Sequence, residues 1–152
     1  MEKDFSGTLA LDLGNTNTVI AFQGEKDTDL ILLEIPGITS SPGVIPTVVW
    51  YESQETIARI GESALKKKDF SDSEICFHSN FKRLIGNPME NQKKKFLSPT
   101  ESGEKFFEIL WENIPKELDI KRLVLTAPID TYKGYRKWLI NLCEGLPINE
   151  IA

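Results

Sequence analysis

The sequence predicts an α/β protein in which a mixed β-sheet is flanked by helices. Two apolar runs near the N-terminus, residues 9–13 and 19–22, are too short for helices and have the length of buried strands. A capping-box sequence at Ser98 then marks the start of an amphipathic helix, and a buried strand and another helix follow it. The order strand, helix, strand favours a parallel crossover beside the antiparallel hairpin.

A short polar turn connects the first two strands and consists of Gly14, Asn15, Thr16 and Asn17. Glycine and asparagine tolerate positive φ, and the amides and hydroxyls of such a turn can point at one anion. We therefore expect phosphate oxygens to find hydrogen-bond donors here. The alternative interpretation is a polar hairpin turn that binds no ligand.

Asp12 lies near the end of the first strand, on the opposite pleat from Leu11 and Leu13. A carboxylate in so apolar a strand is costly unless it has a partner. Beside the turn it can hold a hydrated divalent cation that bridges phosphates. In the alternative interpretation it accepts a local hydrogen bond and holds no metal.

Shorter elements are expected in the middle of the chain. Residues 30–35, 47–51 and 57–60 have the composition of strands, and segments rich in turn residues separate the first two. Residues 62–68 and 75–84 predict two short helices. This part of the chain should therefore pair mostly antiparallel.

The best-marked helix begins at Ser98 and Glu101, which have the spacing of a capping box. Its apolar face comprises Phe106, Phe107, Leu110, Trp111 and Ile114. A buried strand at residues 123–126 follows, and Asp130 or Thr131 should cap the last helix. The inward-facing residues of that helix should be Tyr135, Leu139 and Leu142.

Composition excludes several classes of function. The chain has 152 residues, of which 40% are hydrophobic, a net charge of −5, and no apolar run long enough to span a membrane. The acidic balance gives no general reason to bind nucleic acid, and the basic cluster at residues 93–95 is interpreted as a solvated loop. Isolated Cys76 and Cys143 favour free thiols in a reducing cytoplasm. His78 has no second histidine to form a zinc site, so a packing or surface role is expected.

Three motifs resemble those of a known family. Residues 12–18, Asp-Leu-Gly-Asn-Thr-Asn-Thr, resemble the first phosphate motif of the actin-like ATPase superfamily. Residues 80–86, Asn-Phe-Lys-Arg-Leu-Ile-Gly, resemble the lysine-bearing segment of the seventy-kilodalton heat-shock chaperone family. Residues 123–128 resemble the strand and proline turn of that family. The three motifs in this order are more specific than any one of them.

The resemblance implies an actin-like ATPase (ribonuclease H-like) fold, of which this chain would be the first lobe only. Residues 1–35 and 121–152 would form the core sheet subdomain, and residues 36–120 would form a smaller, inserted peripheral subdomain. A second phosphate motif and an adenosine motif are missing from the sequence, so we expect a second lobe and a peptide-binding domain to lie elsewhere in a longer protein. By itself, the chain should hydrolyse ATP negligibly.

The resemblance also implies roles for individual residues. Lys82 and Asp12 would be catalytic, because the family lysine reaches the terminal phosphate and orients the attacking water. The turn of Gly14, Asn15, Thr16 and Asn17 would bind ATP or ADP, and Asp12 would hold Mg²⁺ through water. Pro128 and Arg136 would form a relay between domains. Without the resemblance, Lys82 and Arg136 are interpreted as solvated surface residues, and Pro128 as part of a helix-initiating turn.

The implied function is that of a nucleotide-binding fragment of a cytoplasmic heat-shock chaperone ATPase, which acts in the stress response. Its partners would be the missing lobe and peptide-binding domain and, through the intact protein, co-chaperones and unfolded clients, with no nucleic acid or membrane. Asn15 departs from the family, which usually has threonine there, so an amide replaces the hydroxyl. Gly-Asn-Thr also occurs in a family of pantothenate kinases. A small-molecule kinase and a non-catalytic interaction module are therefore the alternatives.

Overall fold

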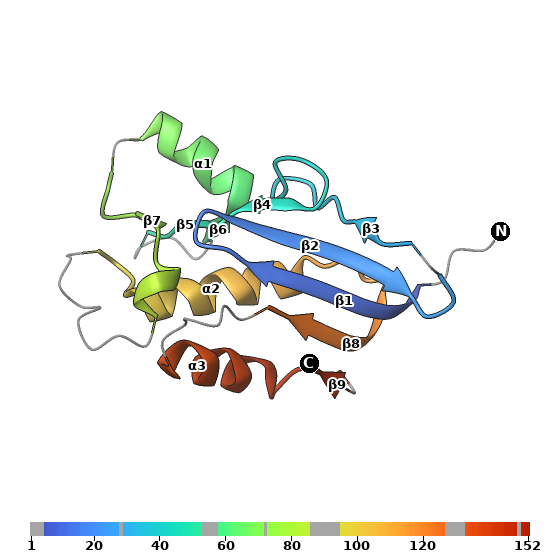
Figure 1. Cartoon of the computed structure of the whole chain (residues 1–152). Helices are drawn as coiled ribbons and strands as arrows, with labels where there is room; N and C mark the ends of the chain where they lie inside the picture. The colour runs from blue at the N-terminus through green and yellow to red at the C-terminus, as the bar shows by residue number, and fades with distance from the viewer. Residues whose placement is uncertain are drawn as a thin grey trace.

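The chain forms two sheets and three α-helices within the part that the computed structural model describes. That part comprises residues 5–27, 29–52, 58–71, 73–85, 95–126, 133–148 and 150–152. The larger sheet is mixed and has six strands, and helices pack against it (Figure 1). The predicted α/β class, with a mixed sheet and flanking helices, is thereby confirmed.

The larger sheet has the strand order β3-β2-β1-β8-β9, and β4 pairs with β2. Its strands are β1 (Ser6–Leu13), β2 (Asn17–Gly24), β3 (Ile31–Leu32), β4 (Val44–Pro46), β8 (Asp119–Leu125) and β9 (Glu150–Ile151). The central strand β1 pairs antiparallel with β2 and parallel with β8, and β8 pairs parallel with β9. The carboxyl ends of β1 and β8 therefore meet at one edge of the sheet.

The smaller sheet has the order β6-β5-β7 and lies beside α1 in Figure 1. Its elements and the adjoining helices are β5 (Val48–Trp50), β6 (Arg59–Ile60), α1 (Gly61–Phe70), β7 (Phe77–Ser79) and the short 3-10 helix η1 (Lys82–Leu84).

The prediction of a helix at residues 75–84 is wrong. Phe77 and His78 pair with β5 instead, and Asn80 has a φ of 54°, a left-handed conformation that an α-helix cannot contain. Of the strand predicted at residues 30–35, only the two residues of β3 pair with a neighbouring strand.

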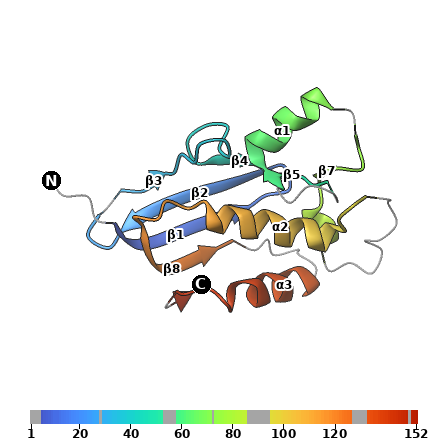
Figure 2. The same cartoon turned by 180° about the vertical axis from the view of Figure 1, so that it is seen from behind.

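Two helices, α2 (Pro99–Glu112) and α3 (Lys133–Cys143), pack against the face of the larger sheet that bears Leu9, Leu11 and Leu13. The predicted capping box is confirmed, since the Ser98 Oγ accepts from the Glu101 amide at 3.1 Å and Glu101 Oε1 accepts from the Ser98 amide at 3.0 Å. The predicted caps of α3, Asp130 and Thr131, lie outside the described residues. Helix α2 lies behind the β1–β2 hairpin in Figure 1 and in front of it in Figure 2.

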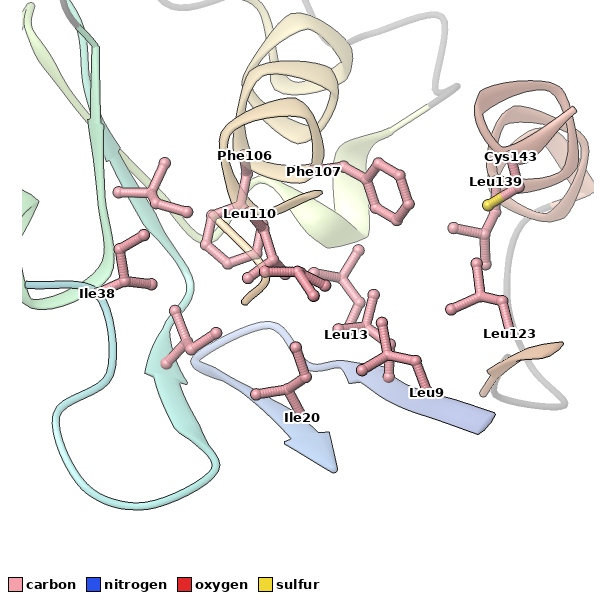
Figure 3. Close-up of a cluster of buried hydrophobic side chains, with 14 of the residues drawn as sticks. Leu9, Leu13, Ile20, Ile38, Phe106, Phe107, Leu110, Leu123, Leu139 and Cys143 are labelled. Atoms are coloured by element: carbon pink, nitrogen blue, oxygen red, sulfur yellow. The ribbon is translucent and has the colours of Figure 1, made fainter. Parts of the chain in front are cut away.

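The main hydrophobic core lies between these helices and the sheet. Figure 3 shows Phe106 and Leu110 of α2 directed toward the hairpin, while α3 packs beside Leu123 of β8. Burying one such side chain stabilises the fold by about 1.5–3 kcal/mol. The core also includes residues between positions 36 and 120, and β4 from that range joins the larger sheet. The division into core and peripheral subdomains stays a prediction.

His78 is a buried packing residue of the smaller sheet, with 2% of its surface exposed. Its Nε2 accepts a hydrogen bond from the Leu97 amide at 3.0 Å, which requires an unprotonated Nε2. Burial has the largest effect and lowers the pKa of His78, while the Val49 backbone raises it by a smaller amount. The Lys95 ammonium lowers it further, and the Cys76 backbone and Glu101 raise it by still smaller amounts.

Stability should therefore fall as the solution is acidified. Because the pKa of His78 is lower in the folded protein than in the unfolded chain, the unfolded state binds more protons below about pH 6.5. The free energy of unfolding, measured by urea titration, should decrease from neutral pH toward the folded pKa. His78→Gln keeps an acceptor for the Leu97 amide and does not titrate, so it should flatten this dependence. Equal slopes for both proteins between pH 7 and pH 5 would contradict the prediction.

Candidate functional site

Polar side chains from separate segments gather where the carboxyl ends of β1 and β8 meet. Asp12 is the second-to-last residue of β1, and Asn15 lies in the hairpin turn. Thr126 directly follows β8, and Lys82 begins η1. Open α/β sheets bind ligands at such an edge, beside the strand where the order of connection reverses. Here the chain passes from β1 to β2 on one side and returns to β8 on the other. The position is therefore one that can hold a ligand.

Asp12 lies on the pleat of β1 opposite Leu11 and Leu13, as predicted, and the structure shows that it is exposed. Its Oδ1 accepts a hydrogen bond of 2.5 Å from the Thr126 hydroxyl. The Thr126 amide also donates to the Leu11 carbonyl at 3.2 Å, which continues the β1–β8 pairing by one residue. Hydrogen bonds to an ionised carboxylate are about twice as strong as those between neutral groups. The contact fixes the direction of Asp12, a role for Thr126 that sequence reasoning missed.

The hairpin turn has the predicted length, since Leu13 pairs with Thr18 and leaves four residues between them. Gly14 was predicted to be needed for a positive φ, but its φ is not positive. Glycine is required there for lack of space, because a Cβ would lie 2.1 Å from the Asn17 carbonyl oxygen. The side chains of Thr16 and Asn17 are exposed, so they can donate to a ligand.

Asn15 connects the turn to the segment that carries Lys82. Its Nδ2 donates to Asn80 Oδ1 at 3.0 Å, while its own Oδ1 is buried and has no hydrogen-bond partner in the described structure. An unpaired buried acceptor costs about 1–3 kcal/mol. Rotating both amides by 180° keeps the bond between them and replaces the unpaired oxygen with an unpaired N–H. The pair can therefore offer an acceptor to a cation or a donor to an anion.

Lys82 is half-buried, and its Nζ lies 5.4 Å from the centroid of the Tyr135 ring. Burial lowers the pKa of Lys82, and the Asp12 carboxylate raises it by a smaller amount. The buried side chains of Phe81 and Ile85 hold the segment in place on either side. The structure thus brings Lys82 and Asp12 close enough for their charges to interact.

The two predicted relay residues stay a prediction. Pro128 lies outside the described residues, and Arg136 is exposed on α3. Tyr135 of α3, which the sequence predicted only as a core residue, contacts Lys82. The helical spacing of apolar residues predicts that Tyr135 is buried, but it cannot predict that the Tyr135 ring contacts Lys82.

The residues present fit a magnesium site of the water-mediated kind. Within the described ranges, no group of three or more His, Cys, Asp and Glu side chains could hold a metal ion directly. Mg²⁺ commonly keeps several waters and uses one or two carboxylates together with phosphate oxygens. The exposed Asp12 carboxylate and the unpaired Asn15 oxygen are ligands of the required type.

No protein-family model matches this chain, and the search of curated proteins also finds no match. The site is therefore interpreted from its own geometry. In the described part of the chain, none of the helices has the length and apolar character needed to cross a membrane.

Gly14→Ala should disturb the turn directly. The new Cβ would clash with backbone at 2.1 Å, so the free energy of unfolding should fall by about 1–3 kcal/mol in urea titrations. Gly145→Ala is the matched control, because nothing lies within 4 Å of its Cβ position. It should change stability by less than about 0.5 kcal/mol. Equal stability of the two variants would show that the turn has another geometry.

The Asn15–Asn80 contact can be tested by a double-mutant cycle with Asn15→Ala and Asn80→Gly. Glycine at position 80 removes the amide without adding strain, since the φ there is 54°. A hydrogen bond of 3.0 Å predicts a coupling free energy of about 0.5–1.5 kcal/mol in unfolding measurements. Strictly additive effects would mean that the two side chains do not interact.

Proposed function

We propose that this cluster binds the phosphates of ATP or ADP with Mg²⁺, and that the chain is one lobe of an actin-like ATPase of the seventy-kilodalton heat-shock chaperone type. The observation that supports the proposal most is the meeting of two motifs. The turn after Asp12 and the segment of Lys82 are far apart in the sequence, yet Asn15 Nδ2 donates to Asn80 Oδ1 at 3.0 Å and joins the two, so that the Asp12 charge acts on Lys82.

Each group has a distinct part in binding. Backbone and side-chain donors of the turn, Thr16 and Asn17 among them, are placed to bind phosphate oxygens. The Lys82 ammonium would offset negative charge on the terminal phosphate, and its partial burial reduces the further desolvation that this contact requires. Asp12, oriented by Thr126, would hold water molecules of the magnesium shell. Bound Mg²⁺ would supply additional neutralisation of phosphate charge.

In this proposal, ATP hydrolysis and chaperone activity require a longer protein. A second lobe would close over the exposed Asp12 and the turn. The intact protein, which would include a peptide-binding domain, would contact unfolded clients and co-chaperones in the cytoplasm. Phosphoryl transfer depends on positioning by groups from all sides. One lobe by itself should therefore bind nucleotide weakly and hydrolyse it negligibly.

A nucleotide titration of the isotopically labelled chain tests the proposal. Mg-ATP and Mg-ADP should shift the amide resonances of residues 14–18 and of Thr126, which surround the proposed phosphates. Asp12→Ala should abolish these shifts, whereas Asp29→Ala, which removes an exposed carboxylate outside the cluster, should preserve them.

Two results would contradict the proposal. One is the absence of shifts in the turn at high nucleotide concentration, which would favour the non-catalytic interaction module. The other is a set of shifts that survives Asp12→Ala unchanged, which would place the nucleotide elsewhere on the chain.

A further inference from the structure

Tyr135 lies in the first part of α3, and only 1% of its surface is exposed. The Lys82 Nζ is 5.4 Å from the centroid of its ring, within the range in which an aromatic face attracts an ammonium group. Burial and the Asp12 charge both raise the pKa of Tyr135, so the ring stays uncharged at neutral pH. The face that meets Lys82 is therefore that of a neutral phenol.

Packing, rather than hydrogen bonding, fixes this ring. The Tyr135 hydroxyl is buried without a hydrogen-bond partner in the described structure, so no polar contact orients it. The ring packs instead against Trp138, with 5.6 Å between centroids. A Cβ at Gly103 of α2 would lie 2.8 Å from both Trp138 Cζ2 and Ile85 Cδ1, so these side chains rest on the same point of α2.

The segment that bears Lys82 and the helix that bears Tyr135 thus share one support. Ile85 anchors the end of the Lys82 segment on Gly103, and Phe81 packs against Phe106 of the same helix, with 6.3 Å between centroids. A displacement of α3 would move the Tyr135 ring relative to Lys82. Arg136, the neighbouring residue, is exposed.

We propose that Tyr135 is a positioning residue, whose ring holds the Lys82 ammonium toward the phosphate site and connects α3 to that site. The inference rests on the proposed function, because it takes Lys82 to bind phosphate. The aromatic ring positions the Lys82 ammonium, and the hydroxyl is not needed for this. Tyr135→Phe is therefore a matched control, and Tyr135→Leu is the variant that removes the aromatic face.

The ligand-free chain gives the first test by NMR. Side-chain protons of Lys82 should show nuclear Overhauser contacts to the Tyr135 ring and an upfield ring-current shift. Tyr135→Phe should keep the shift, and Tyr135→Leu should remove it. An unshifted Lys82 without ring contacts in the wild-type chain would overturn the proposal, and this result needs no variant to fold.

Mg-ATP binding gives the second test. Tyr135→Leu should weaken binding about threefold to tenfold relative to Tyr135→Phe, in keeping with the strength of ammonium–ring contacts. In a Lys82→Ala background the two variants should bind equally. A difference that persists without Lys82, or no difference with it, would overturn the proposal. Failure of the wild-type chain to bind Mg-ATP would refute the proposed function, while the ligand-free spectra would still decide whether Tyr135 positions Lys82.

Discussion

The parallel pairing of β1 with β8 is the interaction on which the site depends. Its register places Leu123 beside Leu9 and Leu125 beside Leu11, so Thr126 follows next to Asp12. The hydrogen bond between these last two side chains joins residues 114 positions apart. The hairpin can form locally, but this pairing requires the intervening chain to return to the sheet. The polar cluster is therefore a product of the completed fold.

Helix α2 gives this pairing its support. Its apolar side chains cover the hairpin, and its small residue Gly103 lets Trp138 and Ile85 approach closely. The same helix therefore supports both the hairpin that bears Asp12 and the segment that carries Lys82. Because interiors are close-packed, a change in one of these contacts is transmitted to the others. A half-buried lysine beside a carboxylate is then held by rigid neighbours, as binding sites require.

Local signals were sufficient to predict the hairpin, the capping box at Ser98 and the pleat on which Asp12 lies, because each depends on neighbours in the sequence. The predicted helix at residues 75–84 failed because pairing of β7 with β5 and the left-handed Asn80 outweigh local helical pattern. The contacts of Thr126 and Tyr135 could not be predicted, since they follow from strand register and helix packing. Motif resemblance selected Lys82 and Asp12, but only the fold brings their charges together.

The central claim is that phosphate and its metal bind where β1 and β8 end. Mn²⁺ replaces Mg²⁺ at oxygen ligands and broadens nearby NMR signals, so Mn-ADP provides a direct measurement. The account predicts broadening centred on residues 12–17, Lys82 and Thr126, with α1 unaffected. Broadening centred on exposed carboxylates elsewhere, such as Glu25, or spread evenly over the chain, would contradict it.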